Sequence, residues 1–84
     1  MRFSDFKMLN LPWQARIICD QGIFLTSRKE DGYFIELYQV DSFYVEVYYR
    51  LKDNEIEKFL SFHDTSMLEP YLKLININFN TIKI

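Results

Sequence analysis

The residues of this chain that could do chemistry are few and stand far apart. His63, the single histidine, is followed by Asp64, and such a pair would suit a catalytic dyad or part of a metal site. A metal ion needs several ligands, however, and only Glu69 adds a carboxylate nearby. We therefore predict a structural role for His63 at a turn, and we expect no catalytic residue, no metal site and no cofactor.

Cys19 is the single cysteine and stands between Ile18 and Asp20 in a predicted helix. A nucleophilic thiol needs a neighbouring base or cation, and no local motif supplies one. We predict an inert thiol that is buried or half-buried. One cysteine cannot form an intramolecular disulfide, which favours a reducing, cytoplasmic location.

Two glutamates offer the alternative chemistry. Glu36 and Glu46 stand on neighbouring predicted strands, and two adjacent carboxylates can divide the roles of general acid and general base. Contacts with tyrosines and arginines explain them more simply. A small-molecule-binding or catalytic pocket near Tyr38, Tyr48 and Glu46 stays open as the alternative function.

Composition limits the class of protein. The 84 residues predict a single domain, 1–84, in which residues 1–10 and 77–84 could be extended arms. A hydrophobic fraction of 49% favours folding, and a net charge of -2 argues against a nucleic-acid partner, which requires clustered lysine and arginine. No apolar run approaches the roughly 18 residues of a membrane span, so we expect no membrane association.

The apolar spacing predicts first a helix and then strands. Asn10 can cap a helix over residues 11–21 that ends at Gly22. Over residues 23–63 the spacing changes to a period of two, and the turn signals EDG, VDSF and KDNE divide this stretch into four strands. We expect these strands to form an antiparallel meander.

The end of the chain predicts a second helical segment. Ser66 and Glu69 have the spacing of a capping box, which favours a short helix within residues 67–76. Because Pro70 suits the first turn of a helix, a regular helix that begins near Glu69 stays open as the alternative. The tail NINFNTIKI alternates in polarity and suits a fifth short strand or a covering segment. The fold class is therefore α+β, in the order α-β-β-β-β-α, with both helical segments on one face of the sheet.

Loop length decides which residues of the first two strands are paired. A three-residue loop over residues 30–32 pairs Leu25 with Leu37, which keeps apolar side chains together. We favour this loop over a two-residue turn at Asp31 and Gly32.

The other two connections are interpreted in the same way. A loop over residues 41–43 opposes Tyr38 to Glu46 and is favoured over a loop over residues 40–42, which would oppose Glu36 to Glu46. A two-residue turn at Asp53 and Asn54 pairs Val47 with Leu60 on one face and Arg50 with Glu57 on the other. Odd-numbered positions of residues 33–51 then face the helices.

The opposite face of the expected sheet gathers aromatic rings with two arginines beside them. The predicted interface residues are Phe24, Phe34, Tyr38, Tyr44, Tyr48, Phe59, Arg28 and Arg50. A bare apolar patch of several hundred Å² usually marks an interface, and aromatic residues with arginine are typical of interface hot spots. We therefore expect a small non-enzymatic interaction domain that associates with a second copy through this face.

Other covers for this face stay open. The N-terminal segment, with Phe3, Phe6, Met8 and Leu9, or the tail over residues 77–84, could fold over it within one chain. A different protein partner or a small molecule could also occupy it.

One resemblance adds to this interpretation. The stretch LYQVDSFYVEVYY, with LEPYL downstream, resembles a pattern in short uncharacterised proteins of Bacteroidetes-type bacteria and would span most of residues 11–76. That family carries no assigned activity, so the resemblance implies a small bacterial cytoplasmic protein and no functional residue.

Overall fold

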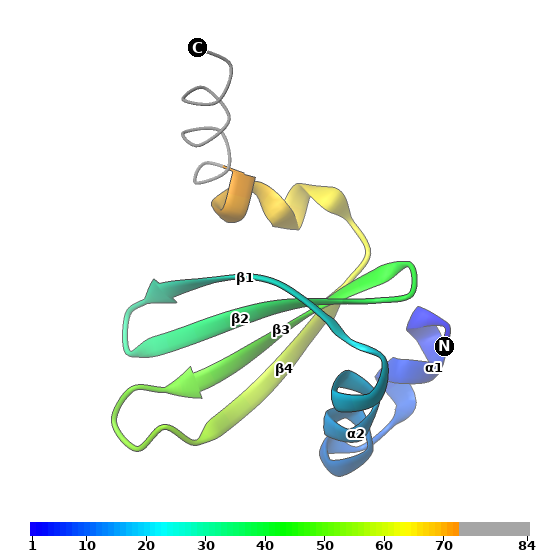
Figure 1. Ribbon diagram of the computed structural model, residues 1–84, viewed down its shortest axis with the longest axis horizontal. Coiled ribbons are helices and arrows are strands. Elements are labelled where there is room, and N and C mark those ends of the chain that lie inside the picture. The colour runs from blue at the N-terminus through cyan, green and yellow to red at the C-terminus, as the bar shows by residue number, and fades with distance from the viewer. Residues whose placement is uncertain (73–84) are drawn as a thin grey trace.

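The computed structural model describes residues 1–72 of the chain (Figure 1). The helices are α1 (Phe3–Met8) and α2 (Leu11–Gln21), and the strands are β1 (Ile23–Glu30), β2 (Tyr33–Val40), β3 (Phe43–Arg50) and β4 (Ile56–Phe62). A 3₁₀ turn, η1 (Thr65–Leu68), and a helical turn over residues 69–72 follow, and we name residues 65–72 the strap. The α+β class and the antiparallel meander, with strand order β1-β2-β3-β4, are confirmed. The tail predicted over residues 77–84, and the predicted helix beyond residue 72, lie outside the described residues.

The predicted limits of α2 are confirmed. The Oδ1 atom of Asn10 accepts a hydrogen bond from the Trp13 N–H at 3.4 Å, and Pro12 occupies the first turn, where its missing N–H costs nothing. Gly22 ends the helix, and its N–H donates to the Ile18 carbonyl at 2.8 Å. Among the residues described, no helix is long and apolar enough to cross a membrane.

The N-terminal residues are not an extended arm. Residues 3–8 form α1 because Phe3 and Phe6, three positions apart, both reach the sheet when the backbone is helical. Their rings lie 5.6 and 5.2 Å from the ring of Phe43. The expectation that residues 1–10 are extended is therefore wrong for residues 3–8, since helix formation buries Phe6 completely.

The connection between β1 and β2 is the two-residue turn that the sequence analysis rejected. Glu30 pairs with Tyr33 across Asp31 and Gly32, and the φ angle of Gly32 is +80°, which glycine adopts without strain. A β-bulge between Phe24 and Thr26 then shifts the pairing by one residue. The favoured register is wrong along most of β1, where Leu37 pairs with Thr26 instead of Leu25.

The connection between β2 and β3 is also a two-residue turn, one residue shorter than either expected loop. Val40 pairs with Phe43 across a two-residue turn, in which Asp41 adopts a φ of 52°. Glu46 consequently pairs with Leu37, and not with Tyr38 or Glu36. Because the register differs from the expected one by a single residue, the side chains of β2 move to the other face relative to those of β3.

Residues 51–55 connect β3 to β4 in a longer loop than the predicted turn at Asp53 and Asn54. In this loop the Arg50 N–H donates a hydrogen bond to the Glu55 carbonyl at 2.9 Å, and Asn54 adopts a φ of 61°. Val47 therefore pairs with Phe59, so the predicted pairing with Leu60 is wrong. The predicted neighbours Arg50 and Glu57 are still close, at 3.9 Å.

The helical segments lie on opposite faces of the sheet (Figure 1). We name the face covered by α1 and α2 the N-terminal face; its core residues are Phe6, Ile18, Val40, Phe43, Val45 and Val47. We name the other the strap face; its core residues are Leu37, Phe62 and Tyr71. The expectation that both helical segments share one face is wrong. Tyr71 of the strap packs against Leu37 and Phe62, and these two residues lie on the side of the sheet opposite Val45.

The predicted parity is correct for β3 and wrong for β2. Val45 and Val47 face the helices as expected, but their partners on β2 are the even-numbered Tyr38 and Glu36. Ile35 lies on the strap face, with its partner Tyr48. Both faces of the sheet are thus at least partly covered by the chain itself, but the second cover is the strap and not the N-terminal segment, which lies on the same face as α2.

Replacement of Phe6 tests whether α1 covers the N-terminal face in solution. We expect Phe6→Ala to lower the free energy of unfolding by about 3 kcal/mol, because a fully buried ring leaves a cavity. Met8→Ala, on the same helix at 86% exposure, should change it by less than about 0.5 kcal/mol. Urea titrations of both variants measure the difference, and equal midpoints would mean that α1 does not pack on the sheet.

Candidate functional site

A buried carboxylate lies at the centre of the strap face. Alternation along β3 directs Glu46 away from Val45 and Val47, and its side chain is only 3% exposed. Its Oε1 atom accepts a hydrogen bond from the Tyr48 hydroxyl at 3.2 Å. Its Oε2 atom accepts bonds from the Tyr71 hydroxyl at 2.5 Å and from Nη2 of Arg28 at 3.2 Å. Both oxygens are therefore satisfied, as a buried charge requires.

Arg28 supplies the opposite charge from β1. Its guanidinium is mostly buried, donates to Glu30 as well as to Glu46, and lies 5.2 Å from the centre of the Tyr71 ring. Burial disfavours the charged form, but the nearby Tyr71 hydroxyl and the carboxylates of Glu30 and Glu46 outweigh it and hold the pKa of Arg28 above its ordinary value. Arg28 therefore stays charged, while its buried Nε has no hydrogen-bond partner among the described residues.

The two phenols of the cluster are held as hydrogen-bond donors. Burial, followed by the charge of Glu46, raises the pKa of Tyr48 above its ordinary value. Burial and the hydrogen bond to Glu46 likewise raise the pKa of Tyr71. Neither hydroxyl can act as a base near neutral pH, so both remain donors to the carboxylate.

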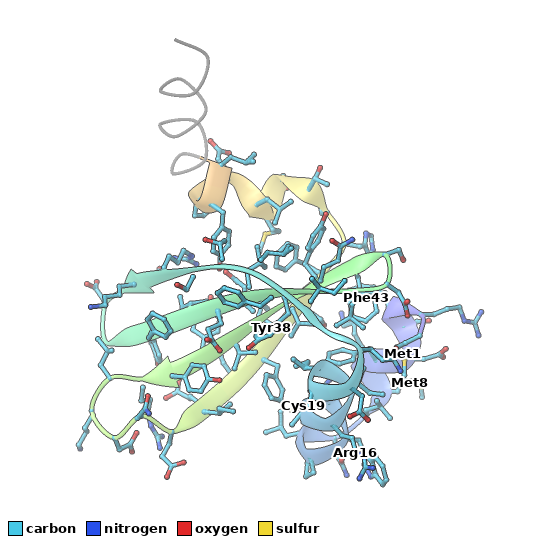
Figure 2. All side chains as sticks on the ribbon, in the orientation of Figure 1. Met1, Met8, Arg16, Cys19, Tyr38 and Phe43 are labelled. Carbon is cyan, nitrogen blue, oxygen red and sulfur yellow. The ribbon has the colours of Figure 1, made fainter. Side chains whose placement is uncertain are left out.

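A cleft of about 720 Å³ opens beside this cluster. The sheet contributes Arg28, Glu46 and Tyr48, with Glu30 at one end. The strap forms the facing wall with Ser66, Met67, Glu69 and Pro70. Figure 2 shows side chains of the sheet and of the strap pointing toward one another. The cleft therefore combines charged, aromatic and apolar groups from distant parts of the chain.

A second, apolar hollow of about 370 Å³ lies on the same face. Its lining includes Leu25, Leu37, Tyr44, Leu68, Tyr71 and Leu72. Tyr71 lines this hollow, and its hydroxyl donates to Glu46, which lines the cleft. We name the second hollow the apolar groove.

The eight residues predicted as one interface lie on two faces. Phe24, Phe34, Tyr38 and Phe59 belong to the N-terminal face, as their cross-strand partners show. Tyr44, Tyr48, Arg28 and Arg50 belong to the strap face. The predicted single aromatic face is therefore wrong, because the register between β2 and β3 differs by one residue from the expected one.

Burial also changes what these rings can do. Tyr38 and Phe59 pack against the core under the helices, and Tyr48 is buried beside Glu46. Phe24 is the member that stays largely exposed, at 52%. Its ring lies 5.7 Å from that of Tyr38, at the edge of the N-terminal face.

The predicted pair of carboxylates does not form. Glu36 faces α2, where its Oε1 accepts a hydrogen bond from the Tyr38 hydroxyl at 3.1 Å. Burial and a hydrogen bond to Glu36 raise the pKa of Tyr49 to about 12 on this same face. Glu36 and Glu46 thus lie on opposite sides of the sheet and cannot divide acid and base roles.

The other chemical candidates have simple surroundings. The ring of His63 packs edge-on against Phe3 at 4.6 Å, which agrees with a structural role. Cys19 is exposed on α2, so the expectation of a buried or half-buried thiol is wrong (Figure 2). Within residues 1–72, no three histidine, cysteine or carboxylate side chains gather in a way that could hold a metal ion.

Sequence reasoning missed three contributors to the strap face. Tyr71 was not singled out, because a tyrosine after Pro70 gives no local signal of its long-range bond to Glu46. Arg28 was predicted as an interface residue, but its bond to Glu46 was not predicted. Lys58 pairs with Tyr48, and its Nζ lies 4.5 Å from the centre of that ring.

Comparison of the chain with protein-family models, with curated proteins and with solved structures finds no match. The resemblance to short bacterial proteins stays a prediction.

Two carboxylates bound to the same arginine provide a matched test of the cluster. We expect Glu46→Gln to lower the free energy of unfolding by about 3 kcal/mol, because it leaves the buried Arg28 guanidinium poorly compensated. Glu30→Gln, which removes a half-exposed partner of the same guanidinium, should cost less than about 1 kcal/mol. Thermal and urea unfolding measure both, and equal losses would contradict a special role for the buried carboxylate.

Proposed function

We propose that the protein is a non-enzymatic binding domain that takes a small molecule in the cleft beside Glu46. The supporting observation is the convergence of Arg28, Glu46 and Tyr48 on a hollow of about 720 Å³. Ligand sites in proteins typically measure roughly 300–1,000 Å³ and place a few polar groups among apolar ones. This is the alternative function of the sequence analysis, moved from Tyr38, which lies on the other face, to the strap face.

The state of the polar groups favours recognition over catalysis. Both oxygens of Glu46 already accept hydrogen bonds, so this carboxylate is not free to take a proton from a substrate. The buried tyrosines stay protonated, and Arg28 stays charged. These groups form a fixed polar surface, which suits orientation of a ligand more than proton transfer.

The lining also indicates the kind of ligand. Charged groups from Arg28 and Glu30 lie on one side, while Leu60, Met67 and Pro70 present apolar surface. A ligand that fits both would carry a polar group beside an apolar body.

A cytoplasmic location belongs to this proposal, since a single, exposed cysteine suits a reducing compartment.

A thermal-shift screen with matched variants tests this function. Amphipathic metabolites should raise the melting temperature of the wild-type protein, because a ligand bound to the native state stabilises it. Met67→Glu, which introduces a charge into the cleft wall, should abolish the shift, while Met8→Glu on α1 should retain it. A broad panel without a stabilising compound, or shifts that survive Met67→Glu, would contradict the proposal.

Self-association is a second candidate function, and a different observation supports it. At the start of β1, an edge strand of the described sheet, Ile23, Phe24 and Leu25 are exposed side by side. An edge strand can pair with the same strand of a second copy, since two antiparallel copies are related by a two-fold axis. A two-fold axis near Phe24 would bring the three exposed apolar side chains of both copies together. The partner proposed here is thus a second copy of this chain.

Sedimentation measurements test the second candidate. If β1 mediates association, the wild-type protein should be a dimer at high micromolar concentration and Phe24→Glu a folded monomer. Leu51→Glu, equally exposed but in the loop between β3 and β4, should leave the dimer intact. A wild-type protein that is monomeric at several hundred micromolar would end this candidate.

A further inference from the structure

We infer that Tyr71 holds the strap against the sheet, and that the cleft is complete only while Tyr71 is bound to Glu46. The inference concerns the formation of the proposed ligand site and therefore rests on the proposed function. It makes Tyr71 a positioning residue for the cleft wall.

The burial of the strap is concentrated in one side chain. Tyr71 is 1% exposed, Leu68 is half-buried, and the other residues of the strap are exposed. On the opposite face, α1 and α2 insert Phe6 and Ile18 into a larger apolar core. The strap has fewer apolar contacts of this kind, so its position depends more strongly on Tyr71.

The polar contacts of the strap converge on the same residue. Within residues 1–72, two polar contacts join the strap to the sheet. The Tyr71 hydroxyl donates a hydrogen bond to Glu46 at 2.5 Å, and the Arg28 guanidinium lies over the Tyr71 ring, 5.2 Å from its centre. The bond from the Ser66 N–H to Asp64 at 2.9 Å caps the beginning of the strap and does not reach the sheet. Removal of the Tyr71 hydroxyl therefore weakens docking without altering the first turn of the strap.

The docked strap also forms the walls of both hollows. Ser66, Met67 and Pro70 face the cleft, whereas Leu68 and Leu72 face the apolar groove. When the strap leaves the sheet, the cleft loses one of its sides. A ligand that needs this wall binds only the docked state, so its apparent affinity falls in proportion to the undocked fraction.

Hydrogen exchange of the unliganded protein tests the role of Tyr71. Tyr71→Phe should accelerate amide exchange in residues 66–72 roughly tenfold, because a lost hydrogen bond to a buried charge shifts the local opening equilibrium by about that factor. Exchange in the centres of β2 and β3 should change much less. Tyr48→Phe is the matched control, since it removes the other phenol from the same carboxylate but lies in β3. Equal exchange in the strap for both variants would overturn the inference.

A rescue experiment separates the hydrogen bond from apolar filling. In Tyr71→Ala, 4-methylphenol should slow the exchange of the strap more than toluene does, because only the phenol can donate to Glu46. Equal effects of the two compounds would overturn the inference. If the alanine variant does not fold, the comparison of Tyr71→Phe with Tyr48→Phe decides.

The outcomes separate the inference from the function on which it rests. Selective acceleration in Tyr71→Phe supports the role of Tyr71 even where a metabolite panel yields no ligand. Uniform exchange contradicts that role even where a ligand binds in the cleft.

Discussion

The two-residue turn at Asp41 and Ser42 is the constraint on which the rest of the structure depends. It sets Val40 opposite Phe43, and strict alternation then assigns every side chain of β2 and β3 to a face. Tyr38 joins Val45 under the helices, while Glu46 joins Leu37 on the other side. A connection longer or shorter by one residue would separate these partners and move the sheet residues of the strap face relative to one another.

Given this register, Glu46 requires partners from distant parts of the chain. Burying a carboxylate is costly unless an opposite charge and hydrogen-bond donors surround it. Arg28 comes from β1, Tyr48 from β3 itself and Tyr71 from the strap. The same contacts that compensate the charge therefore connect an edge strand, a central strand and the C-terminal cover, and they place three of the polar groups that surround the cleft.

The sequence predicted α2 and the four strands well and the registers of the strands poorly, for one physical reason. Asn10, Gly22 and the turn signals act locally, so α2 and the four strands could be located from residue types alone. Register is normally revealed by the contrast between a buried and a solvated face, but β2 carries Ile35 and Leu37 on one face and Tyr38 and Val40 on the other. Because both faces are partly covered, apolar matching could not distinguish the competing loop lengths. The candidate site was only partly predicted for the same reason: Tyr48 and Glu46 were named, but the contact between Arg28 and Glu46 exists only in the correct register.

The two covers of the sheet differ in the forces that hold them, and this difference supports the proposal that the ligand binds on the strap face. A chain of this size gains stability from every apolar face that it can cover, which accounts for a cover from each end of the described chain. The N-terminal cover is apolar, and its hollow near Cys19 and Tyr49 measures about 90 Å³. The strap is held by a tyrosine on a buried ion pair and leaves room on both of its sides. A face covered by apolar packing contributes to stability. A face covered through one polar contact, with solvent-accessible space around it, can admit a ligand into that space.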